Sequence, residues 1–290
     1  MVKVTKSILN KFYKLRKKVK YFRKYDFGFS LVVGGSELYS GAPTLAAMAA
    51  LKTGVDMVRV IAPERAADII ASFSPAITTY PLNGKWFEKK HVGDLLAMVE
   101  SAKAVSRGNV SVIIGGGLGR SKQTQEAILK AMSQVSVPMV IDADAIHALS
   151  KDPSVIKGKQ CIATPHSYEF FVLTNREVYN LSEEEKIKVV KEESSRLGLT
   201  ILLKDKPDII SDGKNVALNS AGSPYMSVGG TGDVLSGICG ALLSRREFSP
   251  FLVAQAAAYI SGQAGSLAAQ DLKESLSPVD VINYIHKVLH

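Results

Sequence analysis

The residues with the clearest chemical potential lie at 227–237, where the sequence runs SVGGTGDVLSG. Gly229, Gly230 and Gly232 precede a segment with helical apolar spacing, and Asp233 falls in its first turn. Free N–H groups and the dipole at a helix start favour an anion such as a phosphate. A carboxylate beside that anion suits a base that takes a proton from a hydroxyl attacking a phosphoryl group. We therefore predict a phosphoryl-transfer site with Asp233 as its base, in preference to a plain N-terminal helix carboxylate.

Other chemically active residues follow short apolar runs that have the composition of buried strands. The groups are Gly34-Gly35-Ser36 after LVV, Gly115 to Gly119 after VSVII, Asp142 and Asp144 after PMVI, His166 after QCIA, and Lys204 after ILL. Parallel strands bring their carboxyl ends to one edge of a sheet, where ligands bind. We expect these residues to meet at that edge, with at most one of the two aspartates pointing into the site and Lys204 meeting phosphate.

The rest of the sequence supplies the scaffold that such an edge requires. From residue 29 onward, short β-branched runs alternate with helical stretches, as in FSLVV followed by APTLAAMAALKTG. This alternation predicts a mostly parallel sheet covered by helices on both faces. The sequence contains no internal repeat and no linker long enough to divide domains. We predict a single α/β domain over residues 25–290.

Composition narrows the class of protein. The chain has 290 residues, of which 46% are apolar and 22% charged, as in an ordinary globular protein. No apolar run approaches the roughly 18 to 20 residues of a membrane span, and the lysine-rich N-terminus lacks the apolar segment of a signal peptide. Cys161 and Cys239 lack metal-ligand spacing, so we expect two buried thiols in a reducing cytoplasm.

The formal net charge of +9 is concentrated at the N-terminus. Residues 1–24 contain ten basic residues and no acidic one, which leaves 26 basic against 27 acidic residues in the remainder. Nucleic-acid binding by the whole fold is therefore not expected. Apolar residues at helical spacing predict an amphipathic arm over 1–24, and they are Ile8, Phe12, Leu15, Val19 and Phe22. We favour packing on the domain or a neighbouring subunit, with an acidic partner or membrane surface as the alternative.

The sequence lacks two common nucleotide-binding motifs, and it leaves the role of one histidine open. The run GGGLG at 115–119 lacks the G-x-G-x-x-G dinucleotide fingerprint, and the sequence has no G-x-x-x-x-G-K-[ST] motif of a P-loop ATPase. The glycines still allow a bulky ligand to approach the backbone closely. In TPHSYE, His166 and Glu169 lie three residues apart at a helix start, where ligand contact and a purely structural role are equally open.

The motifs together resemble a known family. VVGGSELYSGAPTLAAMAALKTGVDMVRV, IIGGGLG, VIDADAIHAL, TPHSYEF and GGTGDVLSG occur in the order seen in nucleotide-dependent NAD(P)H-hydrate dehydratases of the ribokinase-like superfamily. The resemblance covers roughly residues 26 to 270 and implies a ribokinase-like three-layer fold. It implies a substrate, NADH or NADPH hydrated on the nicotinamide ring, and a phosphoryl donor, ADP or ATP, used with Mg²⁺. Transfer of a phosphoryl group to the ring hydroxyl creates a leaving group whose departure restores the reduced cofactor.

The same resemblance implies roles for individual residues. Asp233 is the catalytic base, and the amides around Gly230 and Gly232 stabilise the transferring phosphoryl group. Glu169 positions the metal–phosphate assembly. The residues implied in contact with the hydrated cofactor are Ala42, Gly117, Gly119, His166 and Asp233. The residues implied in nucleotide binding are Lys204, Asp205, Lys206, Pro207, Asp208, Gly230 and Gly232.

The chain departs from the family pattern at four places, and alternatives remain. Gly116 stands for a proline, Ser167-Tyr168 for Pro-Gly, Asp205 for a glycine after Lys204, and Tyr25 for a glycine. The change at Asp205 leaves ADP and ATP open as donors, because a carboxylate repels phosphate. One rival is a ribokinase-like kinase acting on a vitamin precursor or sugar, and another is a catalytically silent nucleotide-binding protein. Family members commonly assemble into tetramers or larger oligomers, so we expect a homo-oligomer.

Overall fold

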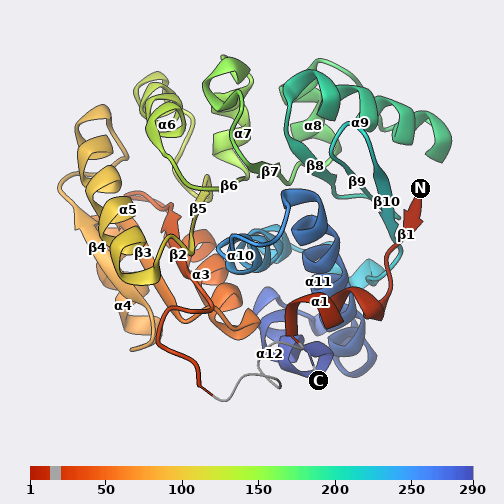
Figure 1. Cartoon of the computed structure of the whole chain (residues 1–290), viewed down its shortest axis with the longest axis horizontal. Helices are drawn as coiled ribbons and strands as arrows, with labels where there is room; N and C mark the ends of the chain where they lie inside the picture. Colours follow the sequence, from red (N-terminus) through yellow and green to blue (C-terminus); the bar gives the residue numbers. More distant parts are fainter. Residues whose placement is uncertain (14–20, 290) are drawn as a thin grey trace.

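A single sheet runs through the middle of the molecule (Figure 1). The computed structural model describes residues 1–13 and 21–289. In that part of the chain ten strands form the sheet, and in sheet order they are β1 (Val2–Lys3), β10 (Val216–Asn219), β9 (Asp208–Ser211), β8 (Thr200–Leu203), β7 (Cys161–Ala163), β6 (Met139–Ile141), β5 (Val110–Ile114), β2 (Phe29–Val33), β3 (Met57–Pro63) and β4 (Thr78–Leu82). Neighbours from β4 to β8 are parallel, whereas β8–β9 and β9–β10 are antiparallel. The predicted mostly parallel sheet is confirmed.

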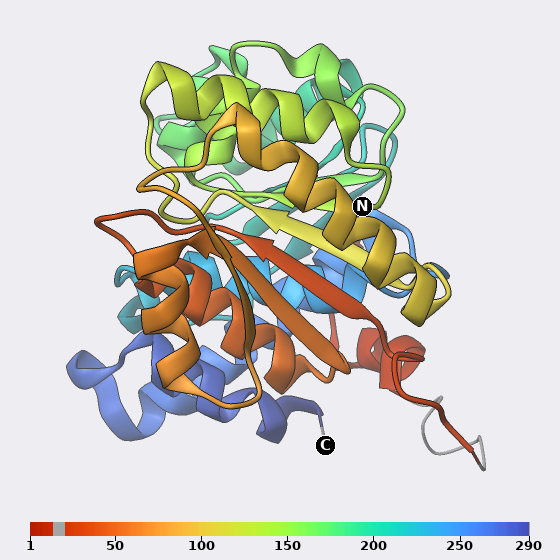
Figure 2. The same ribbon diagram turned by 90° about the vertical axis from the view of Figure 1, so that its left-hand side faces the viewer.

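Helices cover both faces of this sheet (Figures 1 and 2). One face carries α1 (Leu9–Tyr13), α3 (Gly41–Thr53), α4 (Glu64–Phe73), α10 (Thr231–Leu243), α11 (Pro250–Leu272) and α12 (Pro278–Leu289). The other carries α5 (Val92–Ser106), α6 (Lys122–Gln134), α7 (Asp144–Leu149), α8 (Ser167–Thr174) and α9 (Glu183–Leu197). Short 3₁₀ turns span Lys6–Ile8, Lys89–His91, Pro153–Ile156, Pro224–Met226 and Lys273–Ser275. The arrangement has three layers, helix, sheet and helix.

Each strand feeds both apolar layers because successive side chains point to opposite faces. In β2, Val32 joins the core under α3 and α10, whereas Leu31 and Val33 join the core under α5 and α6. The central strands β2, β5, β6 and β7 are buried throughout, which explains their continuous apolar sequences. Both cysteines are buried and unpaired, Cys161 in β7 and Cys239 in α10.

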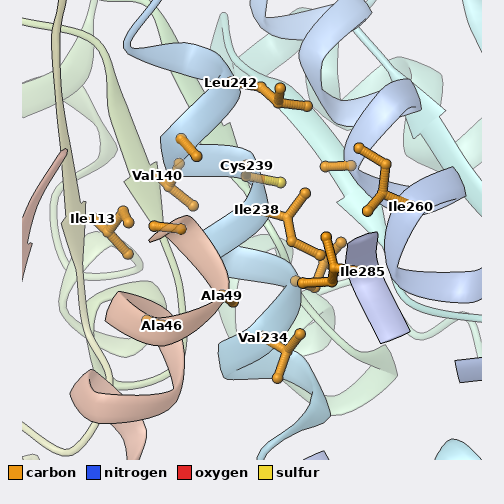
Figure 3. Packing of buried hydrophobic residues seen from close by; sticks show 14 of the residues in the cluster. Ala46, Ala49, Ile113, Val140, Val234, Ile238, Cys239, Leu242, Ile260 and Ile285 are labelled. Atoms are coloured by element: carbon orange, nitrogen blue, oxygen red, sulfur yellow. The ribbon is translucent and has the colours of Figure 1, made fainter. Parts of the chain in front are cut away.

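Helix α10 is held very close to α3, as Figure 3 shows around Ala46 and Ala49. A Cβ atom placed on Gly237 would lie 2.2 Å from the carbonyl oxygen of Ala46, and one on Gly240 would lie 2.2 Å from Cδ1 of Ile113. Only glycine permits these approaches. The position of the α10 N-terminus, which carries the GGTGD motif, is therefore fixed by backbone packing along the helix behind it.

The described part of the N-terminal arm differs from the single amphipathic helix predicted over 1–24. Residues 2–3 form a strand because Val4 N donates to Leu218 O at 2.9 Å and β1 pairs with β10, giving this edge hydrogen-bond partners. Phe12 is buried in α1, with its ring centroid 4.1 Å from that of Phe248, so the arm packs on its own domain. Phe22 is 40% exposed, while the predicted positions Leu15 and Val19 lie outside the described residues.

No helix among the described residues combines the length and the hydropathy that a membrane span requires.

Candidate functional site

The strand ends predicted to converge do meet at one edge. Lys204 follows β8 and His166 follows β7, and the two form an isolated parallel bridge that extends the sheet pairing. Lys204 N donates to Pro165 O at 2.8 Å, and this hydrogen bond holds the lysine backbone at the end of the sheet. The loops that follow β2, β5 and β6 begin at the same edge, because these strands are parallel.

Lys204 is the cation at the centre of this edge. Its Nζ lies 3.5 Å from Asp142 Oδ1 and 3.5 Å from Glu169 Oε2, and both carboxyl side chains are almost fully buried. Burial opposes the charge on Lys204, but the two carboxylates outweigh it and raise its pKa. Burial, reinforced by Glu169, also raises the pKa of Asp142 in spite of the lysine. The lysine therefore stays protonated at neutral pH and can attract an anion.

Asp233 lies next to this charge cluster, in the first turn of α10. Burial and the nearby carboxylate of Asp142 raise its pKa to about 7, while Lys204 opposes the rise. A Cβ atom on Gly116 would lie 3.0 Å from both Asp233 Oδ1 and the Cβ of Ala42. The structure thus brings Ala42, the glycine loop and Asp233 together, and a carboxyl with a pKa of about 7 is suited to proton transfer at neutral pH.

The N-terminus of α10 leaves its first amides available. Gly230 is the N-cap residue with φ of +102°, and no side chain in the described part of the chain caps the helix. First-turn N–H groups have no acceptor inside their own helix. A Cβ on Gly232 would lie 3.2 Å from Lys204 Nζ, so these amides and the lysine cation face the same space. The glycine at 230 is also required by packing, since a Cβ there would lie 2.7 Å from Pro278.

The loop 115–119 is packed against its neighbours. Gly117 and Gly119 have φ of +71° and +89°. A Cβ on Gly117 would lie 2.9 Å from the Cβ of Tyr39, and one on Gly119 would lie 3.0 Å from the ring of Trp86. These glycines therefore have intramolecular reasons for their identity, in addition to the predicted close approach of a ligand.

The two aspartates after β6, of which at most one is expected to point into the site, face different partners. Asp142 faces Lys204, whereas Asp144 accepts hydrogen bonds from Gly119 N and from Arg120 Nε, each at 2.8 Å. Ala143 between them has φ of +46°. Asp144 thus holds the glycine loop in place while Asp142 joins the charge cluster.

His166 and Glu169 form a capping box at the start of α8. Nδ1 of His166 accepts from Tyr168 N and Glu169 N, and Glu169 Oε2 accepts from His166 N at 3.0 Å. This arrangement places the imidazole proton on Nε2 when the ring is neutral. The histidine side chain is 51% exposed at the rim, so it can also contact a ligand.

Lys204 also lines a cavity of about 520 Å³. The predicted nucleotide residues that line it are Lys204, Asp205, Lys206, Asp208 and Gly232, whereas Pro207 and Gly230 are not among its lining residues. Further walls come from residues that the sequence analysis missed, namely Ala221, Gly222, Ser223, Pro224, Met226, Ser227, Thr231, Leu235, Ala258, Ser261 and Gly262. Most of these residues are small, a property common to many packed helices and turns, and Met226 and Leu235 lack even that signal.

Asp208 lies in the wall of this cavity. Its Oδ1 accepts from Asp205 N at 3.3 Å and its Oδ2 accepts from Asn219 Nδ2 at 2.8 Å. Burial raises the pKa of Asp208 to about 6, although the amide of Asn219 opposes the rise. Asp208 therefore ties the loop after β8 to β10 and shapes the cavity.

The donor set fits Mg²⁺ only in combination with phosphate. Among the described residues, no three His, Cys, Asp or Glu side chains are grouped to hold a metal ion alone. Mg²⁺ keeps several waters and takes one or two carboxylates together with phosphate oxygens. Glu169 and Asp142 can supply those carboxylates beside Lys204, so a phosphate-borne Mg²⁺ fits this edge whereas a protein-only cage does not.

An uncapped helix N-terminus, a half-buried lysine and buried carboxylates lie together at one edge of a three-layer α/β fold. The fold is ribokinase-like, as the comparison with solved structures shows. A ribokinase-like superfamily protein from Enterococcus faecalis has a TM-score of 0.83 at 22% identity, covering 100% of this chain and 95% of that one. The ADP/ATP-dependent NAD(P)H-hydrate dehydratase from Bacillus subtilis, co-crystallised with ATP and Mg²⁺, has a TM-score of 0.77 at 24% identity, covering 93% and 92%.

The family is set by the sequence comparisons. The family model described as NAD(P)H-hydrate dehydratase matches residues 30–287, and this chain belongs to that family. It is 41% identical over 269 residues to the bifunctional NAD(P)H-hydrate repair enzyme of Pyrobaculum aerophilum, covering 92% of this chain and 51% of that enzyme. It is 35% identical over 287 residues to the ADP-dependent (S)-NAD(P)H-hydrate dehydratase of Nitrosopumilus maritimus, covering 99% and 96%. The chain spans about half the length of the bifunctional relatives it matches.

Proposed function

We propose that this protein repairs hydrated NADH or NADPH by a nucleotide-dependent dehydration. The observation that carries the proposal is the position of Asp233, whose carboxylate lies between the loop at Gly116 and the lysine at the cavity edge. Membership of the NAD(P)H-hydrate dehydratase family supports the same reaction. The full-length match to an enzyme named as ADP-dependent favours ADP as the donor, with ATP as the alternative.

The proposed chemistry has two steps. Asp233 takes the proton of the ring hydroxyl, whose oxygen then attacks the terminal phosphorus of ADP while the bond to AMP breaks. The phosphate formed on the ring is a better leaving group than hydroxide, and its elimination restores the reduced nicotinamide. A base with a pKa of about 7 is partly ionised at neutral pH and still basic enough to accept the proton.

We assign different residues around Asp233 to the hydrated cofactor and to the nucleotide. Ala42, Gly117, Gly119 and His166 are the residues proposed to contact the hydrated cofactor. The cavity beyond Lys204 is proposed for the nucleotide, held through the five-residue segment from Lys204 to Asp208. Amides of Gly230 and Gly232 would stabilise the charge on the phosphoryl group in transit. Mg²⁺, when bound through Glu169 and phosphate oxygens, would neutralise phosphate charge.

The experiment that tests the function mixes the protein with hydrated NADH and ADP. Recovery of the absorbance of the reduced nicotinamide ring, matched by release of AMP and phosphate, is the expected result. Formation of a stable phosphorylated product from a vitamin precursor or sugar, with no recovery on hydrated NADH, would favour the rival kinase. ATP in place of ADP, and hydrated NADPH in place of hydrated NADH, determine the preferred donor and substrate.

We propose further that the protein works in the cytoplasm as a homo-oligomer, with residues 1–24 as an accessory segment to the domain at 25–290. Two buried, unpaired cysteines support a reducing compartment. Burial of Phe12 against Phe248 supports a structural role for the first residues, in preference to an acidic partner or membrane surface. Light scattering of the full chain and of a chain lacking residues 1–24 measures whether this segment affects assembly.

A further inference from the structure

Asp205 is a carboxylate in the wall of a cavity proposed to hold phosphates. It lines the cavity between Lys204 and Lys206, directly after the lysine of the charge cluster. A free carboxylate at that position would repel a nucleotide, since like charges within a few ångströms interact strongly where solvent is limited. A site built for phosphate therefore needs a device that neutralises this group.

The structure supplies such a device from helix α9. Lys186 Nζ lies 2.6 Å from Asp205 Oδ2, and the two side chains are only 18% and 21% exposed. The second oxygen, Oδ1, accepts from Lys206 N at 2.8 Å. Both carboxylate oxygens of Asp205 thus have donors from the protein. Lys186 itself is not among the residues that line the cavity.

The position of Lys186 on its helix makes this pairing informative. The first turn of α9 carries Glu183, Glu184 and Glu185, as the helix dipole favours, and Ser182 caps it with Glu185. Lys186 follows directly, in a part of the helix where a cation gains nothing from the dipole. A mostly buried lysine there is explained by the carboxylate it meets across the loop. Figure 1 shows α9 on the same side of the molecule as β8 and β9, between which Asp205 lies.

We propose that Lys186 is a positioning residue for the nucleotide, which neutralises Asp205 so that phosphate can occupy the cavity beside it. This inference rests on the proposed function for the identity of the ligand. Lys186 acts through Asp205 and does not contact the nucleotide. Its importance should therefore disappear when Asp205 has no charge, which separates this role from a general contribution of Lys186 to stability.

The test is a double-mutant cycle on the full chain with Lys186→Met, Asp205→Asn and the double variant. Calorimetry measures the dissociation constant of ADP, and steady-state kinetics measure KM for ADP and kcat. Lys186→Met is expected to raise the dissociation constant and KM about tenfold, with kcat unchanged within about twofold. The double variant is expected to bind ADP as Asp205→Asn does, within about twofold. Lys186→Arg should restore most of the affinity.

Lys188→Met is the matched control, because it removes the same charge from the same helix and lies outside the cavity lining. It should leave ADP binding unchanged. An equal loss of affinity from Lys186→Met in the Asp205→Asn background, or no loss in either background, would overturn the inference. ADP binding that depends on Lys186 without any turnover of hydrated NADH would refute the proposed function and leave the inference standing. Normal turnover of hydrated NADH, with ADP binding that does not depend on Lys186, would support the proposed function and overturn the inference.

Discussion

On one side of Asp233 the loops after β2 and β5 are packed into one another, whereas on the other side the segments after β8 and β10 enclose a cavity of about 520 Å³. We call these the packed half and the hollow half of the site. In the packed half the space that side chains would need at Gly116 and Gly117 is already taken by other parts of the protein. In the hollow half the lining carries the lysines and small residues that can surround an exchangeable ligand.

This difference suggests how the work is divided. The packed half fixes the orientation of the reacting groups, because a rigid surround holds a carboxylate in one geometry. The hollow half provides affinity for the donor through charge and free amides. Substitutions in the packed half should therefore change kcat, and substitutions in the hollow half should change nucleotide affinity.

Asp233→Asn, at the boundary between the halves, is expected to have the largest effect. Loss of a general base should lower kcat about 10³-fold while ADP binding, measured by calorimetry, is retained. In the wild type, kcat should rise with pH through about 7, because the base must be ionised. Turnover by Asp233→Asn close to the wild-type rate would show that the base lies elsewhere.

The same variant should be more stable than the wild type at high pH. The pKa of Asp233 is raised in the folded protein from 3.8 to about 7, so the native state binds protons more tightly than the unfolded state. Wild-type stability therefore falls as pH rises between those values, by up to about 4 kcal/mol. Thermal melts of the two proteins should coincide below about pH 4, where the carboxyl is protonated in both states, and diverge above it.

Lys204→Met should show that the hollow half depends on charge. Removing the cation leaves Asp142 and Glu169 buried without their shared partner, which should lower the free energy of unfolding by about 3 kcal/mol. ADP affinity should fall about 10²-fold. The double variant Lys204→Met with Asp142→Asn is expected to recover stability but not affinity. Wild-type ADP affinity in Lys204→Met would remove this lysine from the nucleotide site.

Gly116→Ala should have the smallest effect of the three variants and tests whether the packed half orients Asp233. The new Cβ would lie 3.0 Å from Asp233 Oδ1 and from the Cβ of Ala42, so the carboxylate must shift by a few tenths of an ångström. We expect kcat to fall about tenfold with KM for ADP unchanged, since the shift misaligns the base. Gly93→Ala in α5 is the control, because a Cβ there meets nothing within 4 Å. Equal kinetics for both variants would contradict a packed half.

Much of the fold could be predicted because its signals are local. The predicted helical stretch APTLAAMAALKTG corresponds to the observed α3, and the strand FSLVV is the observed β2. The apolar runs of β5 and β7 are short, that of β5 is rich in β-branched residues, and the helices between strands show their own spacing. The N-terminal prediction was wrong at residues 2–3, because an edge strand finds its hydrogen bonds in β10, more than 200 residues away.

Local sequence patterns were enough to predict the mostly parallel sheet with helices on both faces, the GGTGD motif at a helix start, and the strand ends that carry Asp142, His166 and Lys204. The pairing of Lys186 with Asp205, and the contribution of α11 to the cavity, became visible only in the folded structure. The physical reason is the range of the interactions. Periodicity, turn chemistry and helix starts depend on residues a few positions apart, whereas a side chain's electrostatic partner or a cavity wall depends on which distant segments the folded chain brings together.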